Sequence, residues 1–363
     1  MMAQHRPYPA TLLDPDRTTG LIMCGMGGPD GPAAVEPFLR NLFADPAIFP
    51  VPRPLGPILG RFIAKVRAPG VRKRYLSISP DGATTQLPTT LRQGEELARR
   101  LSAANRRTVS GAAMRYWRPY PDETVTKMRA RGAAQYLVVP TYPQYSSATN
   151  GSTLDFVLDS LSRLAPEAPV HVVSAWGLEP GYLAALARPV RNSLTAWAHE
   201  GVDPAHCAWV SVAHALPRKL VDRGDPYLDQ TLDTVTAVHG AVQQHLADQG
   251  HAEWFAALPG GTVPLLAFQS RVGPIRWLGP EITRVVRGLA HDGCRHLHVQ
   301  PVSFTCEHIE TLVELDRELK EKAISAGVGE YRRGAALNLD GGWLDSMAGG
   351  WVDSIFQRED ALA

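Results

Sequence analysis

The chain has 363 residues, a length that predicts two domains at about 150 residues each. Apolar residues make up 44% and charged residues 20%, as in a globular protein with enough chain to bury a large core without disulfides or structural metal. Lysine and arginine number 37 and aspartate and glutamate 36, and the resulting net charge of +1 argues against a nucleic-acid-binding protein.

Cysteine usage and hydropathy favour a cytoplasmic protein. Cys24, Cys207, Cys294 and Cys306 form no Cys-x-x-Cys pair and fit neither a disulfide framework nor a zinc ribbon. No apolar run approaches the roughly 18 residues needed to cross a bilayer, and the N-terminal residues lack the apolar core of a signal peptide. We therefore expect a reducing, cytoplasmic compartment, with peripheral contact to a membrane surface left open.

The N-terminal part of the chain predicts one strand, one tight turn and one helix. After a polar, loose leader over residues 1–18, a short apolar strand is expected at 21–24. The glycine-rich turn 25–31 follows, and then a helix over 34–44 with one apolar face. The proline-rich segment 46–59 carries several apolar side chains and predicts a loop or lip rather than regular structure.

Downstream, short apolar runs alternate with helical patterns. The predicted strands are 108–114, 135–140, 170–174, 208–212, 263–268 and 296–301. The predicted helices are 91–101, 123–131, 154–164, 183–197, 227–246, 280–289, 308–326 and 344–356. This alternation is typical of βαβ units with parallel strands, and the number of units favours two doubly wound domains that divide near Trp176–Pro180.

Ligands of doubly wound sheets bind beyond the carboxyl ends of the strands. That rule directs attention to the loops 25–31, 115–119, 141–151, 213–226 and 302–310. The first of these does not match the dinucleotide pattern Gly-x-Gly-x-x-Gly, because Asp30 stands where the third glycine is required. A tight turn between strand and helix is the simpler interpretation, and a ligand-contacting turn of another type stays open.

Two of these loops carry side chains suited to proton or metal chemistry. His214 follows the strand 208–212, and an imidazole titrates in the range that suits a base or a metal ligand near neutral pH, although a structural histidine is the more common case. Glu307, Glu310 and Glu314 share one helix face, and carboxylates beside His308 suit a hard dication, iron in particular. A solvated acidic helix face is the alternative.

A weaker metal candidate lies on a predicted strand. Cys294, His296 and His298 alternate along the sequence, so their side chains are expected to point to one side. We consider a partly buried strand edge the better interpretation. The chain has no Gly-x-Ser-x-Gly elbow and no convincing Ser/His/Asp set, so nucleophilic hydrolysis has little support.

Together these loops resemble the ferrochelatase family, whose members insert Fe²⁺ into a porphyrin. The resemblance covers roughly 20–357 and rests on short motifs in the family's order. They are the turn Met23-Cys24-Gly25-Met26-Gly27-Gly28-Pro29, the pair Arg115-Tyr116, the loop Tyr142-Pro143-Gln144-Tyr145-Ser146, the segment Ala213-His214-Ala215-Leu216-Pro217, the segment Phe268-Gln269-Ser270-Arg271 continuing to Trp277-Leu278-Gly279-Pro280, and Phe304-Thr305-Cys306-Glu307-His308-Ile309-Glu310.

The resemblance implies an α/β, chelatase-like fold of two Rossmann-like, doubly wound domains, with four-stranded parallel sheets flanked by helices and a cleft between the domains. We expect the N-terminal domain to span 1–175 and the C-terminal domain 176–339. A C-terminal helix over 340–357 is expected to pack back on the first domain. The second domain carries His214 and the acidic helix start at 307–314.

Site roles follow from the same resemblance. His214 matches the family's essential histidine, a proton acceptor and metal contact. His308 and Glu310 match residues that handle protons or guide metal, while Glu314 and Glu307 complete the acidic metal line. Glu307 replaces the aspartate usual in the family and Cys306 replaces a serine. The residues that resemble porphyrin contacts are Met26, Arg115, Tyr116, Tyr145, Trp277 and Phe304.

The implied substrates are Fe²⁺ and protoporphyrin IX, with protohaem and two protons as products in the final step of haem synthesis. Met26 resembles the protoporphyrin pattern. No tightly bound cofactor is expected, and no [2Fe–2S] cluster, because no cysteine follows Cys306. The apolar lip 46–62 is expected to admit the porphyrin and to touch a membrane, with a buried connection as the alternative. A monomer or a homodimer is expected.

Two alternatives to this function remain open at the level of the sequence. One is a coproporphyrin ferrochelatase or another metal chelatase. The other is a non-catalytic carrier of tetrapyrrole or metal, which the joint presence of His214, His308 and Glu310 disfavours.

Overall fold

The computed structural model of the protein describes residues 8–46, 48, 55–271, 273 and 275–357, and the chain forms two compact units. The N-terminal unit takes in the described residues up to Trp176 together with 344–357. The C-terminal unit takes in 177–343. The boundaries therefore fall after Trp176 and after Trp343, and α12 (Gly341–Ser354) crosses the second of them.

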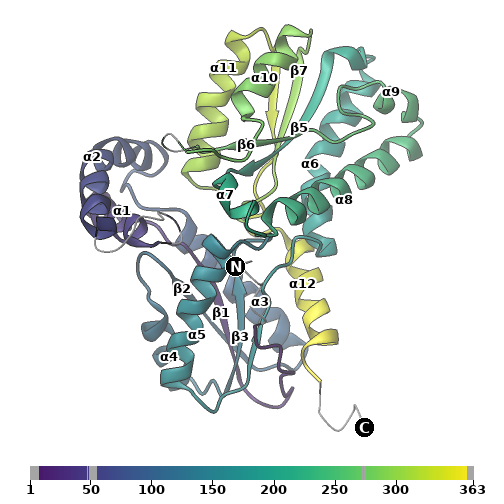
Figure 1. Ribbon diagram of the computed structural model, residues 1–363. Coiled ribbons are helices and arrows are strands. Elements are labelled where there is room, and N and C mark those ends of the chain that lie inside the picture. The colour runs from purple at the N-terminus through teal and green to yellow at the C-terminus, as the bar shows by residue number, and fades with distance from the viewer. Residues whose placement is uncertain (1–7, 47, 49–54, 272, 274, 358–363) are drawn as a thin grey trace. The chain divides into compact units, whose positions relative to one another are not determined.

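The N-terminal unit is built on a parallel sheet in the order β2-β1-β3-β4. Its strands are β1 (Thr19–Gly25), β2 (Thr108–Met114), β3 (Gln135–Pro140) and β4 (Val170–Val172). All seven residues of β1 are buried, as expected for a central strand covered on both faces. Its helices are α1 (Val35–Ala44), α2 (Leu55–Ile78), α3 (Gln86–Ala103), α4 (Pro121–Ala130) and α5 (Ser152–Leu164), with the short turns η1 (Pro32–Ala34) and η2 (Ser147–Gly151), as labelled in part in Figure 1.

The C-terminal unit repeats this arrangement with the strand order β6-β5-β7-β8. Its strands are β5 (Cys207–His214), β6 (Leu266–Gln269), β7 (His296–Pro301) and β8 (Glu330–Arg333). Its helices are α6 (Pro180–His199), α7 (Arg218–Val221), α8 (Tyr227–Asp248), α9 (Ala252–Ala256), α10 (Ile282–His291) and α11 (Lys320–Ser325), with η3 (Pro204–His206) and the π-helix η4 (Glu310–Leu319). The core lies between β5, β7 and the helices α10, η4 and α11.

The strand order explains why two loops of this unit meet. From β5 the chain passes to β6 on one side of it, and it then returns to place β7 on the other side. Such a reversal leaves an opening at the carboxyl ends of the two central strands, where α/β proteins bind ligands. The end of β5 and the loop after β7 therefore lie side by side. The N-terminal unit has the same reversal between β1 and β3.

The fold class predicted from the sequence is confirmed, because both sheets are parallel, four-stranded and flanked by helices. The elements that differ from the prediction include α2 and β8. Residues 55–59 are not a loop but the start of α2, because proline is compatible with a first helical turn, where its missing N–H would have no partner. The strand β8 was not predicted, since its four residues are polar and only half-buried.

Among the described residues, no helix is long and apolar enough to cross a membrane.

The turn 25–31 is a tight connection in which Gly27 adopts a φ of 79°. A side chain at Gly27 would also approach Met114 to 2.9 Å. Both observations account for glycine at this position without a bound phosphate.

Candidate functional site

His214 is the last residue of β5, and its backbone is fixed on both sides. Its N–H donates a hydrogen bond to Ser303 Oγ (3.0 Å), which follows β7. Its carbonyl accepts one from the hydroxyl of Tyr227 (2.9 Å), at the start of α8. The half-buried imidazole is thus presented from a rigid strand end rather than from a flexible loop.

The loop after β7 brings a second imidazole next to His214. The ring of Phe304 is buried and meets His214 edge to face, with centroids 6.3 Å apart. The same ring meets His308 at 4.8 Å. Phe304, predicted as a porphyrin contact, therefore packs against both histidine rings.

His308 and Glu310 form an ion pair. The Nδ1 atom of His308 lies 2.7 Å from the Glu310 carboxylate, and the side chains are 15% and 26% exposed. The backbone N–H of His308 donates to the hydroxyl of Thr311 (3.0 Å). Glu310 begins η4, and π-helical turns of this kind are frequently found at functional sites.

Burial and charge set the protonation of the three groups. Burial alone would raise the pKa of Glu310, but the nearby charges of His308 and His214 bring it below its usual value. Burial lowers the pKa of His308, yet the Glu310 carboxylate outweighs this and raises it. Burial lowers the pKa of His214, an effect that Glu310 only partly offsets. Near neutral pH, His214 is therefore a neutral base beside an ion pair.

The remaining acidic residues of the predicted metal line have other partners. Glu314 accepts hydrogen bonds from Ser270 Oγ (2.5 Å) and Gln269 Nε2 (3.1 Å). Glu307 lies 2.8 Å from the Arg333 guanidinium. Among the residues that the structure describes, no group of three or more His, Cys, Asp or Glu side chains is placed to hold a metal ion. His214, Glu310, Glu314 and Glu307 thus do not form one preformed ligand set.

Trp277 also belongs to the C-terminal unit and is tied to the loop after His214. Pro217 and Trp277 form an antiparallel bridge, and the N–H of Leu278 donates to the carbonyl of Leu216 (2.9 Å). Trp277, a predicted porphyrin contact, therefore lies on a segment that is hydrogen-bonded to the loop after His214.

In the N-terminal unit, Arg115 and Tyr116 converge on a residue that sequence reasoning missed. Asp45 is buried and lies 2.9 Å from the Arg115 guanidinium, while its carboxylate accepts from the hydroxyls of Tyr116 and Ser152 (both 2.8 Å). Arg115 also lies over the ring of Phe156. The only sequence signal for Asp45 is an acidic residue that directly follows an apolar helix.

The other two predicted contacts of this unit follow central strands. Met26 comes after β1, is half-buried, and its carbonyl accepts from the N–H of Tyr116 (3.0 Å). Tyr145 follows β3, is buried, and its hydroxyl lies 3.4 Å from that of Tyr8. Met26 and Tyr116 are thus joined directly, and Tyr145 is held separately.

Comparison with known proteins identifies the family. The family model described as ferrochelatase matches residues 18–353. The ferrochelatase of Gloeobacter violaceus is 37% identical over 334 residues, covering 91% of this chain and 95% of that protein. Those of Geotalea uraniireducens and Hyphomonas neptunium are 34% and 31% identical, covering 91% and 94% of this chain and 96% and 89% of those proteins.

This chain belongs to the ferrochelatase family. Ferrochelatases are lyases that insert Fe²⁺ into a porphyrin in haem synthesis, so the family's substrates are a porphyrin and ferrous iron. Among solved structures, SirB from Bacillus subtilis with Fe³⁺ matches with a TM-score of 0.49 and 11% identity, covering 93% of this chain and 96% of that one.

Cys294, His296 and His298, the weaker metal candidate, each have a different partner. The Cys294 thiol donates to the carbonyl of His296, and the His296 ring lies 2.9 Å from Glu330. His298 is buried with Nδ1 2.8 Å from Ser193 Oγ, and burial lowers its pKa to about 4. These side chains are accounted for by packing.

We expect the two histidines of the ferrochelatase site to titrate on opposite sides of the ordinary value of about 6.5. The pKa of His308 should lie above it and that of His214 below it, and Glu310→Gln should lower both because the carboxylate raises both. NMR titration of the imidazoles measures this, with Glu321→Gln on α11 as the control. An unchanged His308 in Glu310→Gln would contradict the ion pair.

Asp45→Asn should destabilise the N-terminal unit, because it removes the charge that three donors share. A buried partner left unsatisfied costs about 1–3 kcal/mol in the free energy of unfolding. Urea unfolding tests this against Asp159→Asn, which is solvent-exposed like its partner Arg163 and whose loss should matter little. Equal stability of the two variants would show that Asp45 holds nothing.

Proposed function

We propose that this protein inserts Fe²⁺ into protoporphyrin IX and releases two protons, with His214 as the proton acceptor. The observation that carries the proposal is a neutral imidazole at the end of β5, next to the His308–Glu310 ion pair. The choice of protoporphyrin over coproporphyrin rests on Met26, which resembles the protoporphyrin pattern.

The chemistry of the porphyrin explains why a base is needed. A free porphyrin carries two N–H protons inside a flat ring, and iron cannot enter until the ring bends and these protons leave. The strain energy of the bent ring, about 1–5 kcal/mol, can be supplied by the binding of its large apolar surface. A base facing the exposed pyrroles must then accept protons. A general base is most effective when its pKa lies near the working pH and its free form is populated.

His214 meets this requirement through its surroundings. Burial keeps the imidazole neutral before the reaction. Once it has accepted a proton, the Glu310 carboxylate favours the imidazolium, since opposite charges at short range stabilise one another. We propose that Glu310, with Glu314 further along η4, also replaces some of the water ligands of the incoming Fe²⁺, because carboxylate oxygens suit hard dications.

Porphyrin contacts are proposed for Met26, Tyr145, Trp277 and Phe304. For Arg115 and Tyr116 we propose a supporting role, because both are committed to Asp45.

His214→Ala should abolish metal insertion while leaving the fold and porphyrin binding intact. Loss of a general base typically lowers the rate by about 10²–10⁴-fold. Anaerobic insertion of Fe²⁺ or Zn²⁺ into protoporphyrin, followed by fluorescence, measures it, and the exposed His291→Ala is the matched control. Near-normal turnover of His214→Ala would refute the assignment. Running the same assay with coproporphyrin decides the preferred ring.

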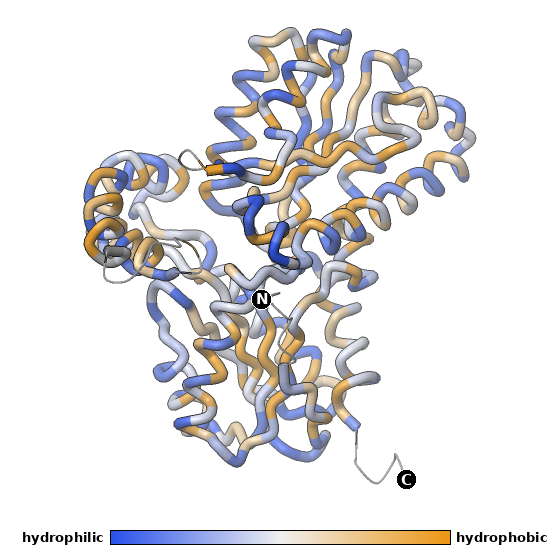
Figure 2. Tube along the Cα trace, viewed as in Figure 1, coloured by the Kyte–Doolittle hydropathy of each residue, from blue (hydrophilic) through white to orange (hydrophobic). Residues whose placement is uncertain are grey.

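We propose in addition that α2 contacts a membrane surface. Ile58, Leu59, Phe62 and Val66 are 67%, 40%, 66% and 64% exposed, so a buried connection is wrong for these residues. Residues 46–80 contain no acidic residue, and basic residues alternate with apolar ones along α2. Figure 2 shows hydrophilic and hydrophobic positions interspersed along this helix. Exposed apolar side chains among basic ones are typical of helices that lie on anionic membranes. Phe49 and Val51 of the predicted lip lie outside the described residues.

Binding to vesicles should require this exposed face. Wild-type protein is expected to co-sediment with anionic vesicles at low salt and to release as salt increases, because the basic residues are then screened. Phe62→Ser with Val66→Ser should weaken binding, whereas Val263→Ser, an equally exposed apolar residue of the other unit, should not. Failure of the wild type to bind at low salt would remove this proposal.

A further inference from the structure

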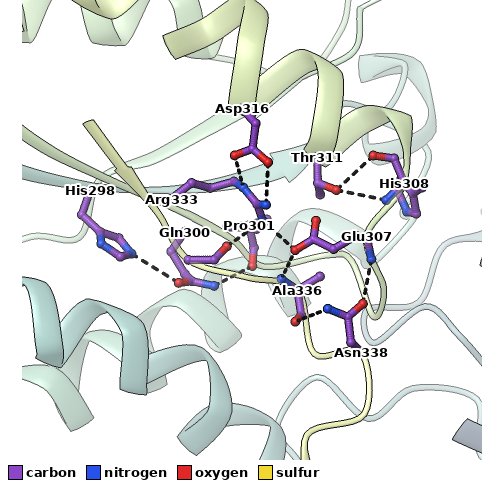
Figure 3. Close-up of polar contacts among 11 residues, drawn as sticks. His298, Gln300, Pro301, Glu307, His308, Thr311, Asp316, Arg333, Ala336 and Asn338 are labelled. Carbon is purple, nitrogen blue, oxygen red and sulfur yellow. Dashed lines mark hydrogen bonds and ion pairs between the residues drawn. The ribbon is translucent and has the colours of Figure 1, made fainter. Parts of the chain in front are cut away.

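Arg333, the last residue of β8, is a nearly buried cation shared by two carboxylates. Its Nε and Nη2 atoms lie 2.6 and 2.7 Å from the two carboxylate oxygens of Asp316, a bidentate pair. Its Nη1 atom lies 2.8 Å from Glu307 Oε1. The guanidinium is 10% exposed and Glu307 17% exposed. Figure 3 shows Arg333 between the two acids.

The two carboxylates stand on either side of the catalytic pair in the sequence. Glu307 directly precedes His308, and Asp316 lies within η4 after Glu310. A second set of contacts holds Glu307. Its carboxylate accepts from the N–H of Ala336 (2.9 Å), and its own N–H donates to Asn338 Oδ1 (3.0 Å). Arg333 therefore connects the end of an edge strand to the loop and to the helix that carry His308 and Glu310.

The first turns of η4 are held from the opposite edge of the sheet as well. Gln269 ends β6, and its amide donates to the carbonyl of Glu310 (2.8 Å) and to the carboxylate of Glu314 (3.1 Å). Because β6 and β8 are the two edge strands, the start of η4 is fixed between their ends. A π-helix forms less regular hydrogen bonds than an α-helix, so side-chain contacts of this kind decide where its first residues lie.

The path of the chain after Arg333 is constrained in the same region. A Cβ at Gly334 would lie 1.7 Å from Oε1 of Gln300, which is itself buried on β7. A side chain after Arg333 would therefore require the buried Gln300 amide to move. The backbone at Arg333 is therefore constrained by the strand β8 before it and by the close approach of Gly334 to Gln300 after it.

Arginine is required here rather than a cation in general. Its planar group offers a fixed fork to Asp316 and a further N–H to Glu307, whereas a lysine ammonium is a point charge that cannot make this geometry. Removal of one partner of a buried ion pair leaves the other charge without compensation. Glu307, once released, would no longer anchor the residue next to it.

We propose that Arg333 is a positioning residue for metal insertion, which holds His308 and Glu310 in register with His214 through Glu307 and Asp316. This inference rests on the catalytic roles proposed above for His308 and Glu310. It changes the role of Glu307 from a metal ligand to an anchor, and it gives the replacement of the family's aspartate a function, since the longer side chain spans from the loop to Arg333 and Ala336.

The test compares kcat and the porphyrin KM of Arg333→Lys, Glu310→Gln and the double variant, in anaerobic Fe²⁺ or Zn²⁺ insertion followed over hours. A small displacement of reacting groups costs up to about a hundredfold in rate, so Arg333→Lys should lower kcat by about ten- to a hundredfold with KM nearly unchanged. In the Glu310→Gln background the same change should have little further effect, because residues that act as one unit are not additive.

The matched control is Arg332→Lys. Arg332 is the neighbouring residue on β8, but it pairs with Glu330 and lies over the ring of Trp197, so its replacement should leave kcat near that of the wild type. If Arg333→Lys fails to fold, Asp316→Asn serves instead. It keeps the guanidinium and the Glu307 contact and should lower kcat severalfold with the same lack of additivity.

The outcomes separate this inference from the proposed function. If Glu310→Gln has a lowered but measurable kcat, then a normal kcat for Arg333→Lys, or an equal loss in both backgrounds, overturns the positioning role alone. A wild-type kcat for Glu310→Gln overturns the catalytic proposal itself, and the positioning role with it. If Arg333→Lys lowers kcat in the wild-type background but has little further effect in Glu310→Gln, the result supports both the positioning role and the catalytic proposal.

Discussion

The chemistry proposed for this protein depends on a partly buried ion pair placed next to a neutral imidazole. His308 and Glu310 neutralise one another, so a carboxylate can remain ionised in partly dehydrated surroundings. Without His308, burial would favour the protonated form of Glu310 and remove the charge that stabilises a cationic His214. Without Glu310, both histidines would lose affinity for protons. The base and its counter-charge are therefore one unit, and the fold has to place them together.

The same strand order occurs in both units, but the loops at the carboxyl ends of the central strands carry different side chains in each. In the C-terminal unit the ends of β5 and β7 carry His214 and the loop to His308 and Glu310. In the N-terminal unit the ends of β1 and β3 lead to Met26 and to the loop with Tyr145. A π-helical turn follows the third strand in both units, at η2 and η4. One scaffold thus presents apolar and aromatic groups in one unit and titratable groups in the other.

Sequence reasoning reached those parts of the fold that local pattern encodes. The central strands are continuous apolar runs, and the ends of β5 and β7 could be recognised as a place for ligands. It missed β8, which is polar, and α2, which begins within a proline-rich segment. It also missed Asp45 and Arg333, because their partners lie far away in the sequence and no short-range spacing marks them. The roles of the residues at the site remain predictions.

Glu307 illustrates why residue type and spacing cannot assign a metal line. Glu307, Glu310 and Glu314 have the spacing of one helix face, but η4 begins only at Glu310, so Glu307 belongs to the loop before it. Its carboxylate turns to Arg333, Glu310 pairs with His308, and Glu314 accepts from Gln269. The three acids therefore have different electrostatic surroundings. A carboxylate compensated by a guanidinium attracts a dication less than one whose partner is an imidazole that can lose its proton. On this argument, Fe²⁺ should interact with Glu310 in preference to Glu307.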